Sequence, residues 1–159
     1  MASDIFAKIG DIKGESLDDK HKDEIEVLSW SWGLTNAIVT SGGGGSAAGK
    51  PHFQDFSFTH NIDKASPVLL QACATGVHIK EATITHRKAG KGQQEFLVFK
   101  MNDVIITGVT QSDSAESGRP ENVSLVFSKV DLEYKPQKPD GSLDAGVHFK
   151  YDIGANKTW

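Results

Sequence analysis

The segment from Gly42 to Pro51 has the residue spacing of a phosphate-binding loop. Gly44, Gly49 and Lys50 match G-x-x-x-x-G-K, in which backbone N–H groups and the lysine surround phosphates. Pro51 stands where the pattern needs Ser or Thr for magnesium, and it has neither a hydroxyl nor an N–H group. The next residues, HFQDFSFTH, alternate as in a strand, so no helix N-terminus follows to hold a phosphate. The sequence favours a flexible, glycine-rich connection at about residues 41–50 over a nucleotide site.

The remaining reactive side chains form no recognisable catalytic or metal-binding pattern. H-E-x-x-H, paired C-x-x-C and G-x-S-x-G motifs are all missing from the sequence. Cys73 is the single cysteine, and its neighbours in LLQACATG indicate a small buried hydrophobe rather than a nucleophile. We therefore expect no enzyme activity, no metal and no cofactor. The six histidines stand singly in the sequence: His21, His52, His60, His78, His86 and His148.

A long polar segment, GDIKGESLDDKHKD, occupies residues 10–23 between two predicted strands. Its charges alternate in sign, which is typical of a solvated loop rather than an acid–base pair or a cation site. Long loops in compact domains are often functional, because a rigid scaffold presents them for contact. We expect an extended contact loop at about residues 11–23.

Composition excludes several partners. The 159 residues predict a single domain, residues 1–159, with a core of its own. The net charge of −4, with both signs interspersed, gives no reason to expect nucleic acid or an anionic membrane as partner. No apolar run is long enough for a signal peptide or a membrane span, so we expect synthesis in the cytoplasm and no membrane insertion.

Alternating apolar residues predict strands along most of the chain. In DIFAKIG they are Ile5, Ala7 and Ile9, and GVHFKYDIG alternates in the same way near the C-terminus. Further strands are predicted in HIKEATITHRKAG, QEFLVFKMNDVIITGV and ENVSLVFSKVDLEY, for a total of about seven. The predicted fold class is mainly β, a two-sheet antiparallel β-barrel or sandwich with one short flanking α-helix.

The helix is predicted in NIDKASPVLLQACATG. Asp63 or Ser66 can cap its start, Pro67 lies in the first turn, and Gly76 can end it. Leu69, Ala72 and Cys73 then lie on one face.

The segment EIEVLSWSWGL predicts a strand with two unequal faces. Leu28, Trp30, Trp32 and Leu34 share the face that we assign to the core. The opposite face begins with Ile25 and Val27 and continues with small residues: Ser29, Ser31 and Gly33.

Several of these segments together resemble the Hcp family of the bacterial type VI secretion system. The similar stretches are DIFAKIGDIKGESLDDKHKDEIEVLSWSWG, FSFTHNIDKASPVLLQACATG, ATITHRKAG and RPENVSLVF, in that order. A glycine-rich stretch before the third of the predicted strands and PQKPDG near the end extend the resemblance to nearly the whole chain.

The resemblance implies a structural role. It implies a homohexameric ring that stacks into a hollow tube, inside a contractile sheath, beneath a spike-tip protein and with effector proteins in its lumen. It also implies that the chain leaves the bacterial cytoplasm by type VI secretion, without a signal peptide.

The resemblance also assigns roles to two sets of residues. The loop from Asp11 to Asp23 would reach the neighbouring ring through exposed ion pairs, each worth about 0–1 kcal/mol and strengthened by sixfold repetition. Ser29 and Ser31 would face the lumen, opposite the core tryptophans; otherwise they lie under the helix or at a subunit seam. The candidate stacking residues are Lys13, Glu15, Asp18, Asp19, Lys20 and Lys22.

A monomeric β-barrel that binds a small ligand is the alternative. It also has strands, one helix and no catalytic set, but it needs an apolar interior pocket.

Overall fold

The computed structural model describes residues 3–41, 45–88 and 92–159, which contain twelve strands and one helix. This exceeds the seven predicted strands because several are short, and because the predicted loop at 41–50 contributes to a hairpin. The elements are β1 (Ser3–Ile9), β2 (Ile25–Glu26), β3 (Ser29–Ser31), β4 (Leu34–Ser41), β5 (Gly45–Phe53), β6 (Phe56–Asn61), α1 (Ser66–Thr75), β7 (Ile79–Lys88), β8 (Glu95–Gln111), β9 (Pro120–Val126), β10 (Lys129–Tyr134), β11 (Val147–Asp152) and β12 (Lys157–Thr158).

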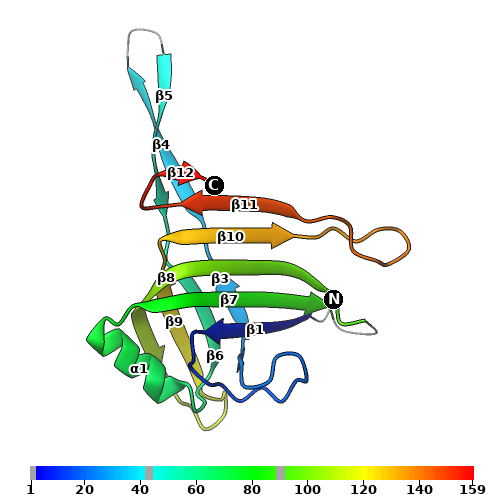
Figure 1. Ribbon diagram of the computed structural model, residues 1–159. Helices are drawn as coiled ribbons and strands as arrows, with labels where there is room; N and C mark the ends of the chain where they lie inside the picture. The colour runs from blue at the N-terminus through cyan, green and yellow to red at the C-terminus, as the bar shows by residue number, and fades with distance from the viewer. Residues whose placement is uncertain (1–2, 42–44, 89–91) are drawn as a thin grey trace.

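Two antiparallel sheets share the long strand β8. Sheet A has the order β12-β11-β10-β8-β7-β1-β2, and sheet B contains β3, β6, β9 and the second half of β8. The strands of sheet B run across the direction of those in sheet A (Figure 1). Asp103, with φ of 53°, lies just before the point where β8 leaves β7 and begins to pair with β9.

The two sheets enclose an aromatic core. The Trp30 ring stacks on Phe56 at 5.5 Å between centroids and meets the edge of Phe99 at 4.8 Å. Phe56 and Phe99 are almost fully buried. Within the described residues the sheets do not close into a barrel, so the observed fold is the sandwich form of the predicted class.

The helix covers one end of the sandwich next to β8 (Figure 1). Pro67 lies in its first turn, and Gly76 ends it in the left-handed conformation with φ of 64°, as predicted. The residue at the N-cap is Ala65, which makes no side-chain cap. Asp63 instead accepts a hydrogen bond from the Ala65 N–H, while the Ser66 hydroxyl accepts one from the Asp63 N–H. No helix in the described part of the chain is long and apolar enough to span a membrane.

Of the side chains in residues 25–34 that were predicted to face the core, only the central two do so. Trp30 and Trp32 pack against the core, but Leu28 and Leu34 are 59% and 43% exposed. Ile25 and Val27, assigned to the opposite face, are buried. The reason is a break between β2 and β3, where the chain passes from sheet A to sheet B and its alternation changes phase.

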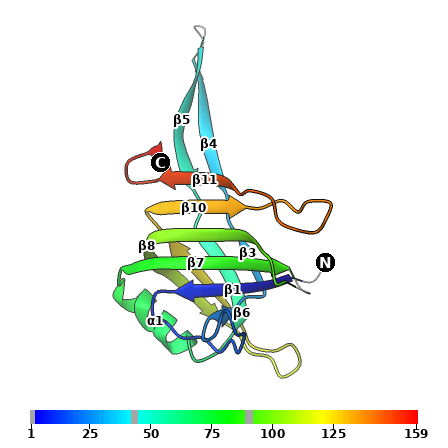
Figure 2. The same ribbon diagram turned by 45° about the vertical axis from the view of Figure 1, so that its right-hand side comes forward.

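The predicted glycine-rich loop at 41–50 is largely strand. β4 and β5 pair as a two-stranded arm, residues 34–53, that projects far beyond the sandwich (Figure 2). The pairing is irregular between Asn36 and Ile38, where a Cβ on Gly49 would lie 2.3 Å from the Ala37 carbonyl oxygen. Gly49 therefore permits a close backbone approach inside the arm, which accounts for one glycine of the apparent phosphate-binding motif. Gly44, the other, lies outside the described residues.

Candidate functional site

The outward face of sheet B contains two rows of small uncharged residues. One row runs Ser31, Ser57, Ser124 and Gly108 across neighbouring strands, and the next runs Ser29, Thr59, Asn122 and Thr110. We call these residues the hydroxyl face.

Hydrogen bonds connect its members. The Ser57 and Ser124 hydroxyl oxygens lie 3.0 Å apart, and the Asn122 amide donates to the Thr59 hydroxyl at 3.2 Å. Because these strands alternate, their inward side chains supply apolar core residues such as Phe58. The hydroxyl face is therefore polar and neutral, on the solvent side of a rigid sheet.

The outward face of sheet A has a different chemistry. One of its cross-strand rows runs Lys8, Thr83, Lys100, Asp131 and Lys150. Charged side chains of both signs thus cover one outer surface of the sandwich, while hydroxyl and amide groups cover the other. The two outer surfaces are suited to different environments.

Ser29 and Ser31 lie on the hydroxyl face, on the side of β3 opposite Trp30. Their assignment to a lumen stays a prediction. Both are exposed, and Trp30 between them points into the core. They lie neither under α1 nor inside the sandwich.

The segment at residues 11–23 folds back on itself and covers part of sheet A. We call it the stacking loop, after the role that the sequence resemblance implies for it. Gly14 donates to the Asp23 carbonyl at 2.8 Å, and Asp23 donates to the Ser16 carbonyl at 2.9 Å. Asp23 itself has a left-handed φ of 62°. A Cβ at Gly14 would lie 2.5 Å from the Glu24 carbonyl oxygen, so this crossing requires glycine. The loop is thus ordered by its own backbone rather than freely solvated.

A charged cluster fixes the stacking loop to sheet A. The Arg87 guanidinium donates to both carboxylate oxygens of Asp18, at 2.8 and 2.7 Å, and to Asp4 at 3.1 Å. It also lies 4.9 Å from the centre of the Phe6 ring, and that ring stacks on His21 at 4.4 Å. The hydrogen bond from Arg87 lowers the pKa of Asp18 to about 2, and the pairing raises that of Arg87.

The candidate stacking residues therefore divide into two groups. Asp18 is bound within the subunit, and Glu15 accepts a hydrogen bond from the Lys64 N–H at 2.8 Å. The remaining candidates are exposed on the loop surface: Lys13, Asp19, Lys20 and Lys22.

His21 and Ser16 depart from the expected solvated loop, since both are buried. The two ring nitrogens of His21 lie 2.9 Å from a Glu24 oxygen and 2.8 Å from a Glu95 oxygen. One side of this charged segment is therefore buried and attaches the loop to the rest of the fold. The alternating charges in the sequence did not indicate this.

A second polar cluster is fully buried beneath sheet B. His60 and Glu121 are both completely inaccessible, with 2.7 Å between the imidazole Nε2 and a carboxylate oxygen. Gln111 donates to the other oxygen of Glu121, and Asp63 lies 3.7 Å from the second imidazole nitrogen. Burial disfavours the charged imidazole, but the carboxylates of Asp63 and Glu121 outweigh it and raise the pKa of His60.

The cysteine and the other histidines in the described ranges lie apart from one another. In the part of the chain that the structure describes, no three or more His, Cys, Asp or Glu side chains are placed to hold a metal. Cys73 is a free, half-buried thiol packed against the core. Burial lowers the pKa of His86, whose ring accepts a hydrogen bond from the Trp30 indole. These groups have structural partners rather than catalytic ones.

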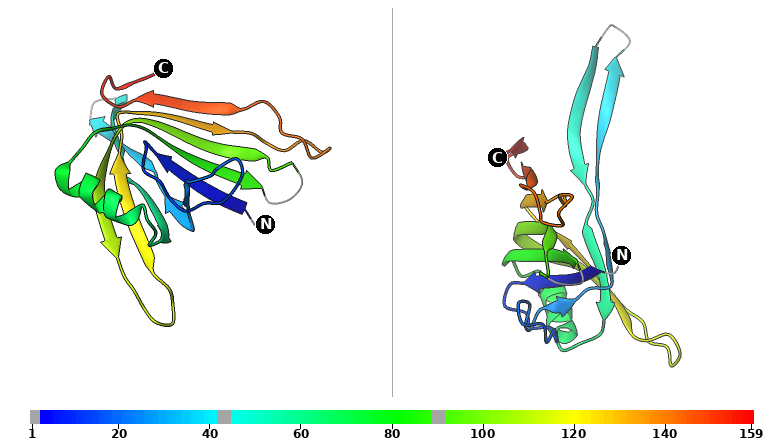
Figure 3. Two further views of the ribbon diagram at one scale, coloured as in Figure 1. Left: turned by 60° about the horizontal axis from the view of Figure 1, so that its bottom comes forward. Right: turned by 90° about the vertical axis from the view of Figure 1, so that its right-hand side faces the viewer.

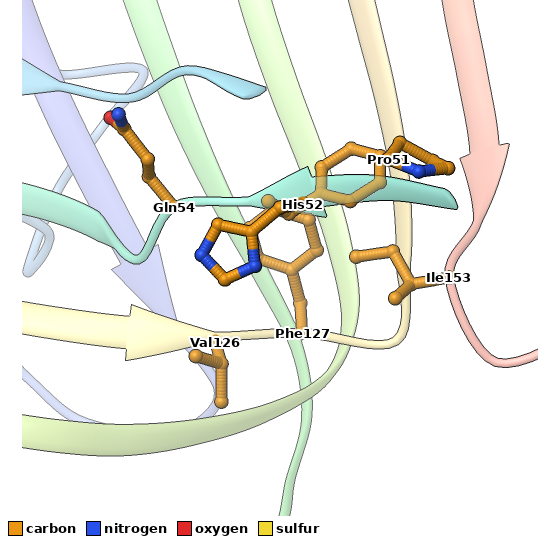
Figure 4. A pocket seen from close by; sticks show the side chains of 7 residues that line it. Pro51, His52, Gln54, Val126, Phe127 and Ile153 are labelled. Atoms are coloured by element: carbon orange, nitrogen blue, oxygen red, sulfur yellow. The ribbon is translucent and has the colours of Figure 1, made fainter. Parts of the chain in front are cut away.

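A small apolar cavity lies where the arm joins the sandwich (Figure 4). It has a volume of about 230 Å³, below the roughly 300–1,000 Å³ of small-molecule sites. Its lining residues come from β5, the end of β9 and the turn after β11: Pro51, His52, Phe53, Gln54, Val126, Phe127 and Ile153.

Comparisons with known proteins identify the family. Residues 6–134 match the family model described as "Type VI secretion system effector, Hcp". Protein hcp1 of Pseudomonas aeruginosa is 45% identical, with 98% of each chain covered. The crystal structure of Hcp1 from Salmonella typhimurium has a TM-score of 0.83 at 40% identity over 100% of both chains. A type VI secretion system effector from Yersinia pestis gives 0.75 at 39%, covering 94% of this chain and 99% of that one.

The chain therefore belongs to the Hcp family, a family of type VI secretion system proteins, as the sequence resemblance implied. Hcp proteins are structural, secreted components of the type VI secretion system.

Proposed function

We propose that this chain forms homohexameric rings that stack into the inner tube of a type VI secretion system. In this proposal the hydroxyl face lines the lumen, where effector proteins travel, and the chain itself is secreted with the tube. A contractile sheath surrounds the tube and a spike-tip protein caps it. The observation that carries the proposal is the difference between the two outer surfaces of the sandwich, one neutral and one charged.

A neutral hydroxyl face suits the wall of a channel. Ser, Thr and Asn side chains stay hydrated and offer neither a strong charge nor an apolar patch to which a passing protein would adhere. The short side chains of Ser29 and Ser31 also leave the most space along the wall.

The projecting arm supports assembly of identical subunits. An isolated two-stranded ribbon is at best marginally stable in water, and the arm exposes Leu34 and Ile38, the latter at 67%. A closed ring needs two different surfaces on each subunit that fit one another. The arm and the free edge of β3, which pairs only with β6 in the described residues, are two such surfaces.

The arm and the stacking loop lie at opposite ends of the molecule (Figure 3). This placement suits rings that repeat along one axis, because each ring then presents different elements at its two ends. The exposed charges of Lys13, Asp19, Lys20 and Lys22 supply weak contacts whose sixfold repetition strengthens stacking. A tube held in this way can be assembled and dismantled.

The first test is the solution mass of the purified chain by light scattering. We expect six times the mass of the chain, and a stable monomer at all accessible concentrations would contradict the ring.

The second test locates the hydroxyl face within the ring. Ser31→Cys, in a Cys73→Ser background, is labelled with a maleimide-linked heavy-atom cluster and the rings are averaged by electron microscopy. We expect added density inside the central hole. Ser142→Cys is the matched control, because Ser142 is exposed in the turn after β10, and its label should lie elsewhere. Label density for Ser31→Cys outside the hole, or loss of rings only with this variant, would overturn the lumen assignment.

The small-ligand alternative finds no comparable support. The space between the two sheets is filled by aromatic side chains, among them Phe56, Phe58 and Phe99. The cavity at the arm, lined in part by the core residue Phe127, is small. Two larger hollows, of about 440 and 390 Å³, lie among charged residues such as Lys13 and Lys80 rather than in the apolar interior.

A further inference from the structure

Arg87 is unusual among the basic residues of sheet A because it is buried. Its side chain is 4% exposed, whereas that of Lys129 on β10 is 45% exposed. A buried guanidinium requires carboxylate partners, because its charge cannot be left without hydrogen bonds away from water. Arg87 finds them in Asp4 on the neighbouring strand and in Asp18 on the stacking loop.

The contact with Asp18 is the more specific of the two. It is bidentate, with the fork of the guanidinium matching both carboxylate oxygens, whereas Asp4 receives a single bond. Asp18 also accepts from the Lys20 and His21 N–H groups, both at 3.1 Å. One carboxylate thus joins the tip of the loop to the sheet and fixes the loop backbone at the same time.

The neighbours of Arg87 reinforce the same attachment. Phe6 contacts both the Arg87 guanidinium and the His21 ring. His21 is the loop side chain that reaches Glu24 and Glu95. Glu95 is also the cross-strand partner of Arg87. The loop is therefore held at two adjacent points.

We propose that the Arg87–Asp18 pair is the positioning element of the stacking loop, holding it in the conformation that engages the next ring. This inference depends on the proposed function. It assigns Asp18 to anchoring rather than to a contact between rings, and it assigns the contacts to the exposed charges of the loop. Arg87 itself touches no neighbouring ring in this arrangement.

The test compares Asp18→Asn with the matched control Asp131→Asn. Both carboxylates have side chains 17% exposed and lie on the sheet A side, but Asp131 binds His148 and is remote from the loop. Hydrogen exchange measures the backbone amides of Gly14, Ser16 and Asp23. Light scattering measures ring mass, and sedimentation measures the protein concentration at which rings stack.

For Asp18→Asn we expect at least tenfold faster exchange at the loop amides, unchanged ring mass and an at least tenfold higher concentration for stacking. Asp131→Asn should change none of these. Arg87→Lys, which keeps the charge but loses the bidentate fork, should have an intermediate effect. A merely structural role would instead lower the melting temperature without altering the concentration at which rings stack.

Two outcomes would overturn the inference. Unchanged exchange in Asp18→Asn would show that the pair does not hold the loop. Faster exchange with unchanged stacking would show that stacking does not use this loop conformation. A wild-type chain that remains monomeric would refute the ring instead, and the exchange rates would still report whether Arg87 anchors the loop.

Discussion

Removing one member of the buried His60–Glu121 pair should destabilise the fold more than removing both. His60→Leu leaves a fully buried carboxylate with only Gln111 as partner. Removing one member of a buried ion pair costs about 3–5 kcal/mol of unfolding free energy. The double variant His60→Leu/Glu121→Leu removes both charges, so we expect it to recover most of this loss.

The pair should also give stability a defined pH dependence. The folded-state pKa of His60 is raised above its ordinary 6.5, so the imidazolium contributes stability that is fully present below about pH 6.5. That contribution is lost as the pH rises through the raised folded-state pKa. His60→Leu should lack this alkaline loss.

The assay is urea unfolding followed by tryptophan fluorescence between pH 6 and 9. One fixed protein concentration is used throughout, because assembly stabilises the folded chain by mass action. A double variant no more stable than His60→Leu would refute the argument. The argument would also be refuted if the unfolding free energies of the wild type and of His60→Leu changed with pH in the same way.

Two further substitutions probe the arm and the core. Gly49→Ala places a methyl group against the Ala37 carbonyl and should disrupt the arm, reducing ring formation in light scattering, whereas Gly108→Ala, whose methyl has ordinary contact distances, should leave rings intact. Phe99→Ala empties the centre of the aromatic core and should lower the unfolding free energy by about 3–5 kcal/mol in urea titrations; a loss below about 1 kcal/mol would show that the core does not depend on this ring.

Alternation predicted the sandwich and the placement of Ser29 and Ser31 opposite Trp30, because it acts over neighbouring residues. In β1 and β3 each side chain points opposite to the next, so Ile9 and Trp30 could be assigned to the core from local sequence. The same rule failed for Leu28 because it assumes a continuous strand. Where the chain passes from one sheet to the other, the alternation of inward and outward side chains changes phase. No local residue pattern marks that point.

The arm and the Arg87 cluster could not be predicted for different reasons. Glycine, alanine and serine in β5 have low strand propensity, and the strand exists because backbone pairing with β4 outweighs that preference. Arg87 and Asp18 are 69 residues apart, so only the folded sheet brings them together. Side-chain charge alone did not distinguish Asp18, which anchors the loop, from its neighbour Asp19.

The strand β8 has a mechanical consequence. Because Glu95–Gln111 belongs to both sheets, force applied to sheet B reaches sheet A through covalent backbone as well as through side-chain packing. The sheets cannot slide apart without breaking main-chain hydrogen bonds on one side of the bend near Asp103. A subunit pushed along its length can thus bear load as one body, and the bend is where we expect it to yield first.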